Sequence, residues 1–136
     1  MIGWVLKFAA KENMFLEDYN CAVCALCTEE TLLHLFLDCP FAMDCWGTLG
    51  LSIQHSDDPF QTTTSFRSQL AVPFSMEIII LMCWAIWSVR NDAIFRNVQP
   101  AIAQARRHFR INFAQVILRA KKSYEPFISQ WLEAYV

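Results

Sequence analysis

The chain has 136 residues, which suits one domain of typical size but excludes most enzymes built on a doubly wound sheet or a barrel. Apolar residues make up 55% and charged residues 18%, a composition that excludes a disordered chain. Its three glycines are too few for the many turns of an all-β fold. Together with the helical patterns described below, this predicts a mostly α protein.

The net charge of −2 conceals two segments of opposite sign. From Glu12 to Glu77, ten acids stand against one base, a net charge of −9. From Arg90 to Lys122, eight bases stand against one acid, a net charge of +7. This asymmetry indicates either that the two segments face each other or that the basic segment meets a polyanion. Solvated helix faces that happen to cluster would give the same pattern.

The first half of the chain carries short helical signals. Apolar residues at helical spacing predict a helix over residues 2–17. Two short helical turns are expected, one over residues 29–37 and one that Pro40 begins and that carries Trp46. The polar stretch from Gly47 to Pro73 is weakly patterned, and we interpret it as a linker with at most one short helix.

A long helix is expected from Ser75, as its N-cap, to about Asn97, before Pro100 stops it. It is apolar on all sides, which predicts that it is buried. Its apolar run from Ile78 to Trp87 has ten residues, whereas a bilayer span needs about 20, so we expect no membrane partner.

An amphipathic basic helix is expected after Pro100. Its apolar residues recur at spacings of three and four and are Ile102, Ala105, Phe109, Phe113, Val116 and Ala120. Four basic residues project from roughly the opposite side, namely Arg107, Arg110, Lys121 and Lys122. A last short helix begins at Pro126. The expected organisation is an N-terminal helix and zinc-binding knuckle over residues 1–50, a linker over 51–73, and a helical region over 74–136.

Five soft metal ligands lie within nineteen residues: Cys21, Cys24, Cys27, His34 and Cys39. Zinc takes four nitrogen or sulfur ligands in a tetrahedron, and a C-x2-C turn can deliver two of them. Either Cys21 with Cys24 or Cys24 with Cys27 could be that first pair. Reduced buried thiols, a redox C-x-x-C and an iron–sulfur site are the alternatives. We interpret Cys45 and Cys83, which stand next to tryptophans, as small buried hydrophobes.

Two stretches of the sequence resemble a known family. The first is Tyr19-Asn20-Cys21-x-x-Cys24, then Glu30-Thr31-x-x-His34-Leu35-Phe36-x-x-Cys39-Pro40-Phe41-Ala42, and then Trp46. The second is Trp84-x-x-Trp87-x-x-Arg90-Asn91-x-x-x-Phe95. Both, in this order, resemble the zinc-binding domain that follows the polymerase in reverse transcriptases of plant LINE-type (non-LTR) retrotransposons. The resemblance covers about residues 13–97.

The resemblance implies a structural zinc ion on Cys21, Cys24, His34 and Cys39, with Cys27 as a spare candidate. It also implies a module that assists nucleic-acid binding, in a fragment that carries neither polymerase nor RNase H. We therefore expect no enzymatic activity. The acidic knuckle should repel phosphates, so Arg107, Arg110, Lys121 and Lys122 are the candidate contacts for RNA or DNA, in weak and sequence-insensitive binding.

Two other functions are open at this point. The first is an orphan helical protein-interaction domain with reduced cysteines, whose protein partner would meet exposed aromatic helices around Trp84, Trp87, Phe109 and Phe113. The second is a hydrolase with a Cys27–His34 pair, which no oxyanion loop or orienting acid supports. The chain carries no visible secretory signal, and we expect an intracellular protein of the nucleus or cytoplasm with reduced thiols.

Overall fold

The computed structural model describes residues 20–24, 29–53, 58–117, 119 and 122–135. Over these residues the chain is mostly helical and contains no strand, which confirms the predicted fold class. The elements in order are η1 (His34–Asp38), α2 (Pro40–Thr48), α3 (Pro59–Leu70), α4 (Ser75–Phe95), α5 (Ile102–Ile117), η2 (Lys122–Tyr124) and α6 (Glu125–Tyr135). The helix expected over residues 2–17 lies outside the described residues.

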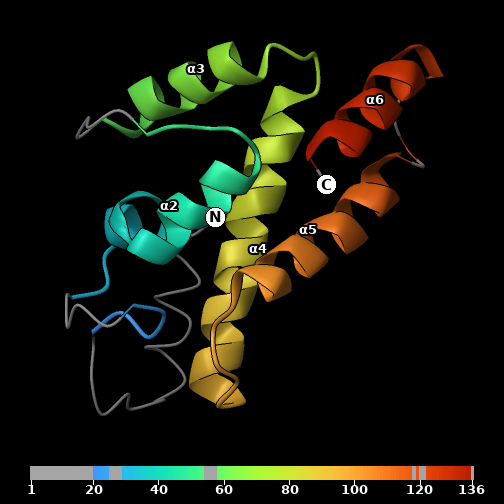
Figure 1. Cartoon of the computed structure of the whole chain (residues 1–136). Coiled ribbons are helices and arrows are strands. Elements are labelled where there is room, and N and C mark those ends of the chain that lie inside the picture. Colours follow the sequence, from blue (N-terminus) through green and yellow to red (C-terminus); the bar gives the residue numbers. More distant parts are fainter. Residues whose placement is uncertain (1–19, 25–28, 54–57, 118, 120–121, 136) are drawn as a thin grey trace.

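The long helix α4 runs through the centre of the fold (Figure 1). α5 packs along it most extensively, and η1, α2 and α3 also contact it. Its inner face is almost fully buried and consists of Ile78, Met82, Ala85, Ile86 and Val89. By length and composition alone α4 could cross a membrane, but here these residues form the core onto which the other helices pack.

The two ends of α4 have different physical causes. The helix begins at Ser75, but the preceding residue, Phe74, occupies the N-cap position and makes no side-chain capping bond. The prediction of Ser75 as N-cap is therefore wrong by one residue, because Phe74 is drawn into the aromatic core and Ser75 is buried in the first turn. The helix ends at Phe95, two residues before the expected end at Asn97, with Arg96 as its C-cap. Asn97 follows in a left-handed conformation, with φ 53°, and turns the chain away before Pro100.

α4 is not buried on every side, which corrects the expectation from its all-round apolar sequence. Ile80, Trp84 and Phe95 are exposed by 47%, 45% and 47%. They share one stripe of the helix because they recur at helical spacing. The helix is apolar on its outer face as well as on its inner one, so composition alone could not identify the side that packs.

The part of the core formed by α5 and α6 is rich in aromatic residues. Phe109 and Phe113 of α5 stack with centroids 5.4 Å apart, and Trp131 of α6 contacts both rings. Phe74 closes the cluster from the start of α4. The predicted apolar face of α5 is confirmed at these buried positions, whereas Ala120 lies outside the described residues.

The segment interpreted as a linker contains α3. Asp58 caps this helix by accepting a hydrogen bond from the backbone N–H of Phe60 at 2.9 Å, and Pro59 follows at the first helical position. Thr62 and Phe66 are its buried residues. The hydrophobic core draws residues from all three of the expected segments.

Candidate metal centre

Three local structures bring together the thiols and the imidazole. Cys21 and Cys24 follow Asn20, which forms an isolated antiparallel bridge with Glu29 and so closes the knuckle at its base. His34 is the first residue of η1. Cys39 is the N-cap of α2, with Pro40 at the first helical position. The residues thus come from a loop, a helical turn and a helix start.

The wide turn of η1 explains the H-x4-C spacing. The hydroxyl of Thr31 accepts a hydrogen bond from the backbone N–H of His34 at 3.0 Å, which fixes the start of the turn. The backbone N–H of Cys39 then donates to the carbonyl of His34 at 2.7 Å. Because this bond joins residues five apart, a π-helical turn places the imidazole and the thiol side by side.

The ligand atoms of Cys21, Cys24, His34 and Cys39 all lie within 4.8 Å of one another. The sulfurs of Cys21 and Cys39 are 3.9 Å apart, and the sulfur of Cys24 is 3.4 Å from Nε2 of His34. A tetrahedron with zinc bond lengths has sulfur–sulfur edges of about 3.8 Å and sulfur–nitrogen edges of about 3.6 Å. Both distances therefore fit one bound ion, and these residues could hold a metal.

The thiols of Cys21 and Cys39 shift each other's pKa through the contact between their sulfurs. Hydrogen bonding to Cys39 and burial raise the pKa of Cys21 well above its ordinary range. The bond from Cys21 lowers the pKa of Cys39, and backbone N–H groups of Phe41 and Ala42 at the start of α2 lower it further. Cys39 is thus the sulfur best prepared to be a thiolate.

The centre is enclosed by protein. Cys21 and His34 are each exposed by only 6% and Cys39 by 0%, while Cys24 is half-buried. A catalytic zinc site keeps one position open to water or substrate, whereas a structural site has four protein ligands. Four soft donors in a largely buried cluster therefore correspond to the structural class.

The residues around the cluster attach it to the helices. Arg90 of α4 reaches Glu30, with Nη2 2.7 Å from Oε1 and Nε 2.9 Å from the same oxygen. The indole N–H of Trp46 donates to the carbonyl of Phe36 at 2.7 Å, which joins α2 to η1. The sequence patterns contain all four of these residues, but nothing in the sequence indicated that they pair.

The remaining cysteine predictions have separate outcomes. Cys27 lies outside the described residues, as does any pairing of Cys27 with His34. Cys45 is 1% exposed and Cys83 is half-buried, and neither belongs to the cluster. Burial raises the pKa of both thiols to about 12, so they remain protonated at neutral pH.

The predicted nucleic-acid residues do not all lie on one helix. Arg107 and Arg110 are exposed on α5, as expected. α5 ends at Ile117, however, so Lys122 lies in the separate turn η2, which corrects its expected place on the basic helix. Lys121 lies outside the described residues. Arg106, which the predicted set omitted, is also exposed on α5.

In the described part of the chain, the two oppositely charged segments meet at one buried ion pair. Among the described residues, Arg90 binds Glu30, and Arg96 and His108 approach Asp92 at 3.9 and 3.5 Å. The arginines of α5 take part in none of these contacts. The basic face of α5 is therefore left without acidic partners in the described part of the chain.

Comparison of the chain with protein-family models, curated proteins and solved structures finds no match in any of the three.

Proposed function

We propose that the chain is a zinc-stabilised helical module in which Cys21, Cys24, His34 and Cys39 bind one structural Zn²⁺. The observation that carries this proposal is the placement of the ligand atoms within 4.8 Å of one another. The soft donor set supports zinc, because three thiols and one imidazole suit this ion better than magnesium or calcium. When bound, the metal supplies cross-linking of the knuckle and no chemistry on a substrate.

The role of such a centre is mechanical. Cys39 is the N-cap of α2. Glu30, which lies between Cys24 and His34 in the sequence, is bonded to Arg90 of α4. Ligands on both sides of Glu30 therefore hold the knuckle against the helical core. Four protein ligands would leave a bound zinc ion no open position, and we propose no catalytic activity for this module.

The wider function that we propose is assistance to nucleic-acid binding, in a module that resembles the zinc-binding domain of LINE-type reverse transcriptases. Arg107, Arg110, Lys121 and Lys122 are the proposed contacts. Support comes from the charge distribution, since the arginines of α5 have no ion-pair partners among the described residues. The knuckle carries exposed acids, so phosphates should approach α5 instead.

Native mass spectrometry of the purified chain, with and without a chelator, tests the zinc centre. We expect one zinc ion per chain, lost in Cys39→Ser and retained in Cys27→Ser. If Cys27→Ser abolishes zinc retention and Cys21→Ser does not, the ligand set begins at Cys24 and the assignment is wrong. Filter binding at two salt concentrations tests the nucleic-acid role separately.

A second candidate function is a protein-interaction domain with reduced cysteines. The exposed stripe of Ile80, Trp84 and Phe95 on α4 favours it. Phe109 and Phe113, which we expected on the same surface, are each exposed by 1% and are core residues. Metal content separates the two functions, because this alternative requires no bound ion.

A further inference from the structure

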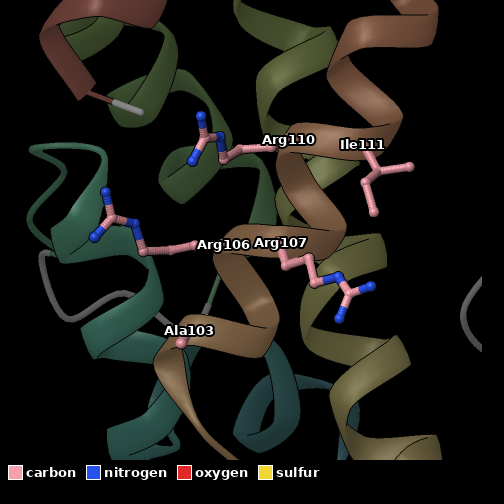
Figure 2. Close-up of a pocket in the computed structure, with 5 residues that line it drawn as sticks. All are labelled: Ala103, Arg106, Arg107, Arg110 and Ile111. Carbon is pink, nitrogen blue, oxygen red and sulfur yellow. The ribbon is translucent and has the colours of Figure 1, made fainter.

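Three arginines line a shallow hollow on α5. It has a volume of about 500 Å³ and is lined by Ala103, Arg106, Arg107, Arg110 and Ile111. Figure 2 shows Arg106 and Arg110 extending to the same side of the helix, with Arg107 on the other side. The small Ala103 leaves room at one end, and Ile111, which is 50% exposed, adds an apolar side chain on the same side as Arg107.

Among the described residues, no ion pair compensates the charge of this hollow. α5 contains no acidic residue over its whole length. Arg106 and Arg110 are four residues apart, a spacing at which like charges repel on a helix. Glu30 and Asp92 already have basic partners, because Glu30 is bonded to Arg90 and Asp92 lies beside Arg96 and His108. An anion in the hollow would relieve this repulsion.

The side chains identify the chemical class of that anion. All three bases are arginines, whose planar guanidinium groups bind phosphate oxygens in pairs, whereas a lysine offers only a point charge. Side chains four residues apart on a helix have Cβ atoms about 5–6 Å apart, which is comparable to the separation of consecutive phosphates along one strand. The exposed side chain of Ile111 offers an apolar contact to an unstacked base, and a duplex keeps its bases stacked inside.

We propose that Arg106 and Arg110 clamp two consecutive phosphates of a single-stranded nucleic acid, with Arg107 holding the strand from the opposite edge of the hollow. This inference rests on the proposed nucleic-acid function and makes it specific. It places the main contact on Arg106 and Arg110, and it does not require Lys121 or Lys122. Recognition is by backbone charge and therefore insensitive to base sequence.

Filter binding of oligo-dT, oligo-rU and a duplex of equal length, over a series of salt concentrations, tests the clamp. The variant is Arg106→Gln with Arg110→Gln. The matched control is Arg67→Gln with Arg96→Gln, which removes the same charge from exposed residues of α3 and the end of α4. We expect the log–log salt slope for single strands to lose about 1.4 in the variant, at about 0.7 per phosphate, and to stay unchanged in the control.

The outcomes distinguish the two proposals. If the parent protein binds no nucleic acid, the proposed function and the clamp both fail. If the parent binds but the variant and the control lose affinity equally, the clamp alone is overturned and general charge attraction accounts for binding. Tighter binding of either single strand than of the duplex supports the clamp, and equal or tighter duplex binding overturns the single-strand assignment. Comparison of oligo-dT with oligo-rU shows which sugar the hollow prefers.

Discussion

The guanidinium of Arg90 and the carboxylate of Glu30 form a buried ion pair between segments that are 60 residues apart in the chain. Their side chains are exposed by 3% and 7%. Two nitrogens of Arg90 contact the carboxylate, and a third bonds to the side-chain oxygen of Asn91. The pair joins the long apolar helix α4 to the segment that carries the candidate metal ligands. The stability of the core and the order of the metal centre should therefore be coupled.

Breaking this pair should be strongly destabilising. Arg90→Met leaves the carboxylate of Glu30 buried without its partner, and we expect a loss of about 3–5 kcal/mol in the free energy of unfolding. The double variant Arg90→Met with Glu30→Leu should recover much of this loss, because no unpaired charge is left. Urea unfolding of both proteins measures the effect. The control Arg96→Met removes a largely exposed base and should change stability by less than about 0.5 kcal/mol. Equal losses in Arg90→Met and Arg96→Met would contradict the coupling.

Local chemistry made much of the metal centre predictable from the sequence. The C-x2-C and H-x4-C spacings limit which side chains can meet, and Pro40 is favoured at the start of a helix whose N-cap is Cys39. The structure brings together the ligand set that the resemblance implies. The choice between Cys21 and Cys27 could not be made from spacing alone, because either pairing gives two thiols on one turn.

Other features depend on contacts that no local pattern records. The pairing of Arg90 with Glu30 joins distant segments of the chain. Nothing in the sequence around either residue predicts that its side chain is buried rather than exposed to solvent. α3 is rich in threonine and serine and buries only Thr62 and Phe66, so its apolar periodicity is too weak to predict the helix. The exposed stripe of α4 was missed for the opposite reason, since a helix that is apolar on all sides gives no signal of which side packs.

Trp46 should be required for the junction between η1 and α2. Its indole N–H donates to the carbonyl of Phe36 at 2.7 Å, and its ring lies 4.7 Å from that of Phe66. Trp46→Phe keeps an aromatic ring but leaves a buried carbonyl unpaired, so we expect a loss of about 1–3 kcal/mol in unfolding free energy. Thermal or urea unfolding monitored by circular dichroism measures it. Trp84→Phe, at a residue that is 45% exposed, is the matched control and should cost clearly less. A cost as large at Trp84 would argue against the role of the hydrogen bond.

Loss of one metal ligand should disorder the knuckle and leave the long helices partly intact. Structural zinc binding contributes on the order of 10 kcal/mol in small modules, and Cys24→Ser removes one of the thiols that supply it. We expect native mass spectrometry to show loss of zinc and circular dichroism to show that much of the helix content persists, because α4 and α5 contact each other directly and more extensively than any other pair of elements. Cys27→Ser should retain both zinc and helix content. A complete loss of helix content in Cys24→Ser would show that the core cannot fold without the metal.

The buried thiol of Cys45 should make the fold sensitive to alkaline pH. Burial raises its pKa from an ordinary value of 9.0 to about 12. Above pH 9 the unfolded chain loses this proton while the folded chain keeps it, so the unfolded state gains stability as pH rises through that window. Each pH unit between 9 and about 12 should cost about 1.4 kcal/mol for this thiol.

Cys45→Ala removes the titrating group while keeping a small apolar side chain in the same buried position of α2. Urea unfolding of metal-saturated protein at pH 8, 9.5 and 10.5, in reducing buffer, compares the variant with the parent. We expect the free energy of unfolding of the parent to exceed that of the variant by a constant amount below pH 9. Above pH 9 this difference should shrink, because only the parent loses the contribution of Cys45. The other thiols, including Cys83, titrate in both proteins and cancel in the comparison. Parallel curves up to pH 10.5 would show that the thiol of Cys45 ionises in the folded protein as readily as in the unfolded chain.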